Sequence, residues 1–106
     1  MKTKDIKAIN IQAREWFDGL NGNSYFSAIV EVYNRKNKKT VLKVPFQYGY
    51  GSHFEYVALD TIKKALNCFK KSGFSGLGRI CKESNIILIS NKNKNCTKTE
   101  LKELVN

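Results

Sequence analysis

The sequence predicts a single α+β domain: an antiparallel hairpin and meander sheet with helices packed on one face, ordered strand, strand, strand, helix, helix, strand, helix. Two runs, at 24–33 and 40–48, alternate apolar and polar residues with the two-residue period of half-buried strands. The run at 53–71 instead repeats its apolar residues at helical spacing. The chain has 106 residues, enough for one hydrophobic core, so residues 1–106 are expected to form one domain.

The first three strands are expected in the N-terminal half. Residues 5–12 alternate loosely and predict a short strand, whereas the signals at 13–20 conflict between a continued strand and a helical turn. The polar segment 34–39 predicts the turn that joins 24–33 to 40–48 as a hairpin. The buried face of the first of these strands is expected to carry Phe26, Ala28, Val30 and Val32, and that of the second Leu42, Val44, Phe46 and Tyr48. Pro45 lacks an N–H donor, which predicts a sheet edge or a bulge at this point.

Capping signals predict the helices. Ser52 and Glu55 have the S-x-x-E spacing of a capping box, so a helix is expected from about His53 to Lys71, with Gly73 as its C-cap. Thr97 and Glu100 repeat that spacing and predict a final helix at 98–105. Between them, the sequence predicts a short helix at 76–84 and a nearly continuous apolar strand at 86–90, which we expect in the centre of the sheet.

The charge of the chain is strongly positive and evenly spread. Lys and Arg number 19 and Asp and Glu 9, which gives a net charge of +10, and each half of the chain carries an excess of five basic groups. A basic excess on the folded domain attracts polyanions, so nucleic acid, either DNA or RNA, is the partner we expect first. The alternative is a surface whose charge serves solubility alone.

Other classes of function find little support in the sequence. Cys68, Cys81 and Cys96 are widely spaced, and with His53 they lack the paired spacing of zinc motifs, so we expect reduced thiols and no metal or other cofactor. No apolar run reaches transmembrane length, and the N-terminus lacks a secretory segment, which favours the cytoplasm and no membrane partner. No catalytic motif is present, so we do not expect an enzyme.

The candidate binding residues fall into three groups. The hairpin turn holds four positive groups, the exposed face of the first helix three more, and two tyrosines offer rings for base stacking. These residues are Arg35, Lys36, Lys38, Lys39, Tyr50, Tyr56, Lys63, Lys70 and Lys71. Gly49 and Gly51 are expected to supply positive φ angles for the strand-to-helix turn, which leaves Tyr50 between them without a core position.

Two segments resemble known proteins. The segment GFSG at 73–76, between two expected helices and before a strand, resembles the GXXG loop of KH domains, in which the loop clamps a nucleic-acid backbone. The combination of AREWFDGLNGNSYFS at 13–27 with PFQYGYG at 45–51 resembles a set of small bacteriophage proteins. That likeness implies a phage setting in a host cytoplasm. It also raises an alternative function, in which the chain binds and inhibits or redirects a host protein complex. The sequence does not predict the oligomeric state.

Overall fold

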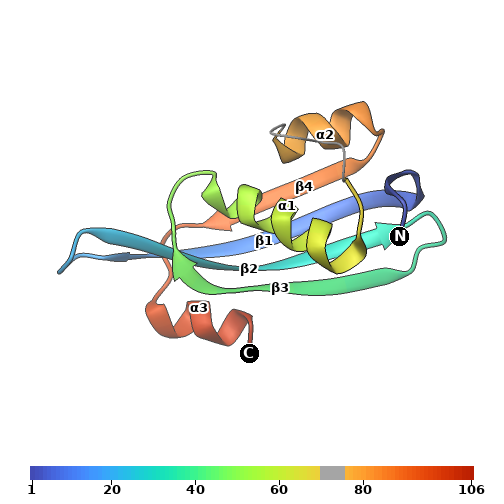
Figure 1. Cartoon of the computed structure of the whole chain (residues 1–106). Coiled ribbons are helices and arrows are strands. Elements are labelled where there is room, and N and C mark those ends of the chain that lie inside the picture. Colours follow the sequence, from blue (N-terminus) through green and yellow to red (C-terminus); the bar gives the residue numbers. More distant parts are fainter. Residues whose placement is uncertain (70–75) are drawn as a thin grey trace.

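The computed structural model describes residues 1–69 and 76–106 (Figure 1). These residues include a four-stranded sheet. The elements are a short 3₁₀ helix at Thr3–Asp5, β1 (Ile6–Asp18), β2 (Asn23–Asn34), β3 (Lys39–Tyr48), α1 (His53–Leu66), α2 (Leu77–Glu83), β4 (Ile87–Asn93) and α3 (Lys98–Leu104). The sheet order is β3-β2-β1-β4. The predicted α+β class and antiparallel meander are confirmed, since β1, β2 and β3 pair antiparallel in sequence order.

β1 and β2 form one long hairpin. They pair from Ile6 opposite Asn34 to Asp18 opposite Asn23. Residues 13–18, for which the sequence signals conflicted, therefore continue the strand. The Asp18 carboxylate accepts hydrogen bonds from the backbone of Leu20 and from the backbone and side chain of Asn21, which closes the turn, and these bonds lower the pKa of Asp18. The hairpin tip extends beyond the rest of the sheet (Figure 1).

β4 lies at the edge of the sheet, and the expectation of a central strand is wrong. It pairs only with β1, in parallel, with Ile9 beside Leu88. The chain between these parallel neighbours includes β2, β3, α1 and α2, so it is long enough for the crossover that parallel strands require. The apolar run that suggested a central strand includes Ile87 and Ile89, whose side chains are more than half exposed on the outer face.

The core lies between the sheet and α1. The face of β2 predicted to be buried is buried, and it meets inward residues of β1, α1 and the segment after α1. Members of this core include Ile9, Ile11, Phe26, Ala28, Val30, Val32, Val44, Phe54, Ala58 and Ile62. Burying aliphatic and aromatic side chains of this size stabilises the fold by about 1.5–3 kcal/mol each.

The start of α1 was predicted correctly, but its end was not. The helix stops at Leu66, where Asn67 adopts left-handed backbone angles (φ 54°) and its N–H bonds to the Lys63 carbonyl, so the predicted end at Lys71 is wrong. Gly73, the predicted C-cap, lies outside the described residues. Ser52 precedes the helix, yet its side chain accepts no capping hydrogen bond, and the expected capping box is absent there.

α1 and α2 lie on one face of the sheet, as expected, whereas α3 lies on the opposite face (Figure 1). Ser27, whose side chain points away from the α1 side, is fully buried and donates to the Leu101 carbonyl over 2.7 Å. Lys98 and Lys102 of α3 lie over the rings of Trp16 and Phe46, at 5.7 and 5.8 Å from the ring centres. The predicted capping box of Thr97 and Glu100 is present.

Candidate nucleic-acid interface

The β2–β3 turn presents positive side chains because Asn34 folds the backbone beneath them. Its side-chain oxygen accepts hydrogen bonds from the backbone N–H groups of Lys36 and Lys38, both at 2.9 Å. Asn37 takes a left-handed conformation (φ 64°) that asparagine tolerates, and it reverses the chain. Arg35, Lys36 and Lys38 are all exposed at this turn. These hydrogen bonds therefore hold the backbone of the turn in one conformation, and the cations project from it.

The N-terminal segment adds further cations to the turn. Arg35 donates from its backbone N–H to the Asp5 carbonyl over 2.9 Å and from Nε to the Lys4 carbonyl over 2.8 Å. Lys7 Nζ reaches the Asn37 side-chain oxygen at 3.1 Å. These bonds hold the exposed lysines of the first seven residues beside the β2–β3 turn. None of these lysines was among the predicted binding residues.

The same segment also reaches the C-terminal end of α1. The Met1 amino group donates to the Leu66 carbonyl over 3.0 Å, and the Thr3 hydroxyl accepts from the Phe69 N–H at 3.0 Å. The C-terminal end of α1 is therefore at the same end of the molecule as the β2–β3 turn (Figure 1). Lys63 lies in the last turn of this helix. We name this cluster the basic end; it comprises Lys2, Lys4, Lys7, Arg35, Lys36, Lys38 and Lys63.

Two predicted cations contribute less than expected, and two fall outside the described residues. Lys39 pairs with Glu31 of the neighbouring strand at 3.1 Å, and this hydrogen bond raises the pKa of Lys39. Lys63 is only half-exposed. Lys70 and Lys71, like residues 73–75 of the GXXG segment, are not among the described residues. The free positive charge of the turn thus resides in Arg35, Lys36 and Lys38.

A second feature lies where β3 meets α1. The segment 48–53 and Tyr56 line an open hollow of about 600 Å³ whose walls are mainly aromatic. The side chains of Tyr48, Tyr50 and Tyr56 are 56%, 69% and 57% exposed. We name this feature the tyrosine hollow. Tyr50 and Tyr56, which were predicted for stacking, are both there, and the structure adds Tyr48, which was expected on the inward face of its strand.

A bulge at Pro45 explains the position of Tyr48. Phe26 pairs with Gln47 and Ala28 with Val44, so one residue of β2 faces two residues of β3. The extra residue in β3 reverses the face of the sheet to which the side chains after the bulge point. Tyr48 therefore lies opposite Tyr25, with an edge contact at 6.0 Å between ring centres. Phe46, also expected on the inward face, instead stacks on Tyr25 at 5.2 Å. The prediction that Pro45 marks a sheet edge or a bulge is confirmed on both counts.

The two glycines of the loop have different roles. Gly51 has a positive φ of 61°, as predicted. Gly49 does not, and instead it packs closely: a Cβ atom there would lie 2.5 Å from Phe26 Cε1 and 2.7 Å from His53 Cδ2. Because Gly49 has no side chain, its backbone can pack directly against the ring of Phe26. This contact holds the loop that lines the tyrosine hollow.

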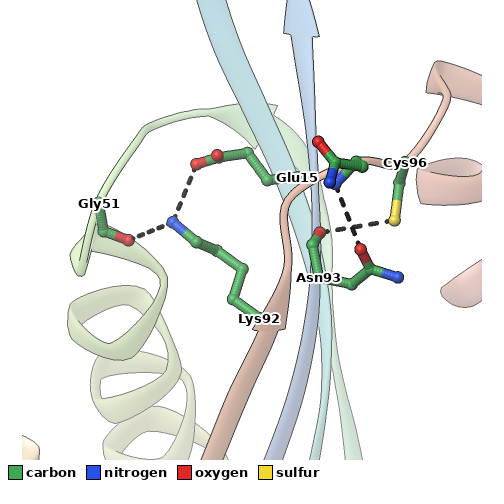
Figure 2. A network of polar contacts seen from close by, with 6 residues as sticks. Glu15, Gly51, Lys92, Asn93 and Cys96 are labelled. Atoms are coloured by element: carbon green, nitrogen blue, oxygen red, sulfur yellow. Dashed lines mark hydrogen bonds and ion pairs between the residues drawn. The ribbon is translucent and has the colours of Figure 1, made fainter.

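A buried lysine also holds this loop (Figure 2). Lys92 Nζ of β4 donates to Glu15 Oε1 of β1 at 2.9 Å and to the Gly51 carbonyl at 2.6 Å, and it lies 5.4 Å from the ring centre of Phe54. The side chains of Lys92 and Glu15 are only 8% and 13% exposed. No sequence signal distinguished Lys92 from the other lysines of the 91–98 segment.

The structure does not bring the predicted cations and tyrosines together. Lys39 and Tyr48 are at opposite ends of β3, nine residues apart, which at about 3.3 Å per strand residue places them about 30 Å apart. α1 runs back along the sheet toward the end where the β2–β3 turn lies (Figure 1). Tyr56 near its start lines the tyrosine hollow, and Lys63 is in its last turn. The predicted binding residues therefore belong to two sites at opposite ends of β3.

The remaining candidates for chemistry lie apart from one another. Cys68, Cys81 and Cys96 are buried free thiols, and burial raises the pKa of Cys81 to about 11. Within residues 1–69 and 76–106, no three His, Cys, Asp or Glu side chains are grouped so that they could hold a metal ion. His53 packs its ring edge-on to Phe26.

None of the helices in the described part of the chain has the length and apolar character needed to cross a membrane.

No protein-family model, curated protein or solved structure matches this chain.

Proposed function

We propose that this chain binds nucleic acid through phosphate contacts made by the basic end. The observation that supports the proposal is the convergence of three segments, residues 1–7, the β2–β3 turn and the end of α1, on one end of the domain. Within the described residues, none of the seven cations there forms an ion pair with an acid. Six of the seven are exposed and Lys63 is half-exposed. Cations of this kind suit a polyanion, because its charges are regularly spaced and its binding releases counterions.

The salt dependence of binding follows from the number of cations. If phosphates contact about five of the seven, the slope of log affinity against log salt is about −4.5 for a duplex and about −3.5 for a single strand. Between 50 and 200 mM salt the affinity should therefore fall about 100- to 500-fold. These contacts carry no sequence information, so we expect little sequence preference from the basic end.

The experiment is an anisotropy titration of DNA and RNA, single- and double-stranded, at both salt concentrations. The variant Arg35→Glu, Lys36→Glu and Lys38→Glu reverses three exposed charges and should lower both the affinity and the magnitude of the salt slope, the latter by about 2–3. All three side chains are exposed, so the variant should fold.

A matched control reverses three exposed lysines elsewhere, Lys94→Glu, Lys98→Glu and Lys102→Glu, with the same change in net charge. This control should keep most of the affinity. Equal weakening of both variants would mean that binding is spread over the whole surface, and it would contradict the proposed site. An unchanged affinity of the basic-end variant would contradict it as well.

A protein partner is the second candidate, and one observation favours it. Part of the outer sheet face carries exposed apolar side chains on its two edge strands, Val41 on β3 and Ile87 and Ile89 on β4, which are 48%, 58% and 51% exposed. Recovery of a stoichiometric protein from nuclease-treated lysate, lost on Ile87→Ser and Ile89→Ser, would favour this function. The phage setting, the cytoplasmic location and the expectation that the chain is not an enzyme stay predictions.

A further inference from the structure

We propose that the tyrosine hollow holds an unpaired nucleobase of the strand whose phosphates contact the basic end; this inference rests on the proposed function. The hollow has the volume of a small-molecule site, about 600 Å³. It is lined by Tyr48, Gly49, Tyr50, Gly51, Ser52, His53 and Tyr56, and none of these residues is acidic. The ligand that suits such walls is flat, neutral and able to form hydrogen bonds at its edge.

The rings that would stack on a base are free. Within residues 1–69 and 76–106, the side chains of Tyr50 and Tyr56 make no hydrogen bond and no ring contact with the rest of the chain. Each is more than half exposed. Aromatic rings whose faces are open to solvent bind bases of any sequence, because every base has a π face.

Tyr56 stands on α1, and the loop that carries Tyr50 is anchored by hydrogen bonds, which lowers the cost of ordering it on binding. Gly49 N–H bonds to the Ser24 carbonyl at 3.0 Å, and Lys92 holds the Gly51 carbonyl. Tyr48 contacts Tyr25 at the other wall. The tyrosine hollow is thus anchored to β2 and β4.

The positions of the two sites also predict that the bound nucleic acid is single-stranded, and they predict its minimum length. A base paired and stacked inside a duplex keeps its faces covered, so the tyrosine hollow can accept only an unpaired base. The separation of about 30 Å from the basic end equals about nine nucleotides at about 3.4 Å per stacked nucleotide. Single strands of about nine or more nucleotides should therefore engage both sites, and strands of about four nucleotides only one.

The first experiment measures competition by unlabelled strands of 4, 8, 12 and 16 nucleotides, and by a 12-base-pair duplex. For wild type, affinity should rise steeply between 4 and 12 nucleotides and exceed that for the duplex. The variant Tyr50→Leu, Tyr56→Leu should lose about five- to 150-fold in affinity for the 12-nucleotide strand for each base no longer stacked, and nothing for the duplex. The matched variant Tyr50→Phe, Tyr56→Phe keeps both rings and should bind like wild type.

The two proposals fail in different ways. If the leucine variant binds the 12-nucleotide strand as wild type does, while the basic-end variant does not, the base site is refuted and the proposed function stands. Equal loss for strand and duplex also refutes the base site. If the basic-end variant keeps full affinity, the proposed function is refuted instead.

A second measurement does not depend on phosphate contacts. Adenosine, which is uncharged, is titrated at millimolar concentration while the tyrosine ring signals are followed by NMR. The rings of Tyr48, Tyr50 and Tyr56 should shift in wild type and in the basic-end variant alike, and ribose should cause no shift. Unchanged ring signals with adenosine refute the base site.

Discussion

Replacement of Lys92 by methionine should destabilise the whole domain, because it breaks an ion pair that is largely buried. Methionine keeps an apolar stem of similar length and removes the ammonium group. The Glu15 carboxylate, 13% exposed, then loses its cation, and the Gly51 carbonyl loses its donor. The contact of the ammonium with the Phe54 ring, at 5.4 Å, is lost too.

The magnitude follows from the burial of the pair. Removal of one partner of a buried pair costs about 3–5 kcal/mol, because the other charge stays uncompensated. Both side chains keep slight exposure, so we expect the lower value, about 3 kcal/mol. A domain of this size is stable by about 5–15 kcal/mol. At a slope of about 1.5 kcal/mol per molar urea, the unfolding midpoint should fall by about 2 M.

The assay is urea unfolding followed by circular dichroism, with Lys64→Met as the matched control. Lys64 pairs with Asp60 at a similar distance, 3.0 Å, but the two side chains are 77% and 57% exposed. An exposed helical pair of this kind contributes about 0.3–0.5 kcal/mol, so the control should unfold almost as wild type does. The two variants make the same chemical change at different burial.

A double variant tests the cause of the loss. Glu15→Leu combined with Lys92→Met removes both charges and should recover much of the stability lost in Lys92→Met alone. The reasoning is refuted if Lys92→Met costs less than about 1 kcal/mol, or no more than the Lys64→Met control. It is also refuted if removing both charges is no better than removing one.

Two further tests concern the loop before α1 and the last helix. Gly49→Ala should lower stability by about 1–3 kcal/mol, because its Cβ would lie 2.5 Å from the Phe26 ring, whereas Gly78→Ala, with no atom within 4 Å, should raise it slightly; equal melting temperatures would contradict the packing argument. Hydrogen bonds from Thr97 lower the pKa of Glu100 from 4.5, so its stabilising effect is present above pH 4.5 and is lost as the pH falls through the lowered value. Glu100→Gln should flatten that part of the acid limb in urea midpoints measured from about pH 3 to 6, and an unchanged limb would contradict the assignment.

Features that depend on residues close in sequence were predictable. The buried face of β2 follows from alternation, since neighbouring side chains of a strand must point to opposite faces. The capping box of Thr97 and Glu100 closes within one turn, so its spacing alone specifies it. Its counterpart at Ser52 has the same spacing and forms no such bond, because Ser52 has φ −88° and ψ 6° and not the extended backbone of an N-cap residue.

The end of α1 shows a limit of periodicity. The apolar stripe continues to Phe69, which is indeed buried, but Phe69 has a φ of 57° and lies outside the helix. A buried residue after a helix fits the same spacing as a buried residue within it. Asn67 was the available signal, since asparagine tolerates the left-handed conformation that ends this helix.

The basic end was predicted only in part because it depends on the register of β1 against β2. With residues 13–18 read as strand, the hairpin would run its full length and place Ile6 opposite Asn34. Lys4 and Lys7 then fall beside the turn that carries Arg35. The sequence did not predict the length of β1, because the signals at 13–20 conflicted between a strand and a helical turn.

The tyrosine hollow depends on a single extra residue. Without the bulge, alternation from Val44 would turn Tyr48 toward the core, as predicted, and only Tyr50 and Tyr56 would remain outside. Pro45 cannot donate to the ladder, and the bulge forms where this donor is missing. One residue type at one position thus converts an inward tyrosine into the third wall of an open aromatic site. In the proposed base site, the same change adds a third aromatic ring about 30 Å from the phosphate contacts.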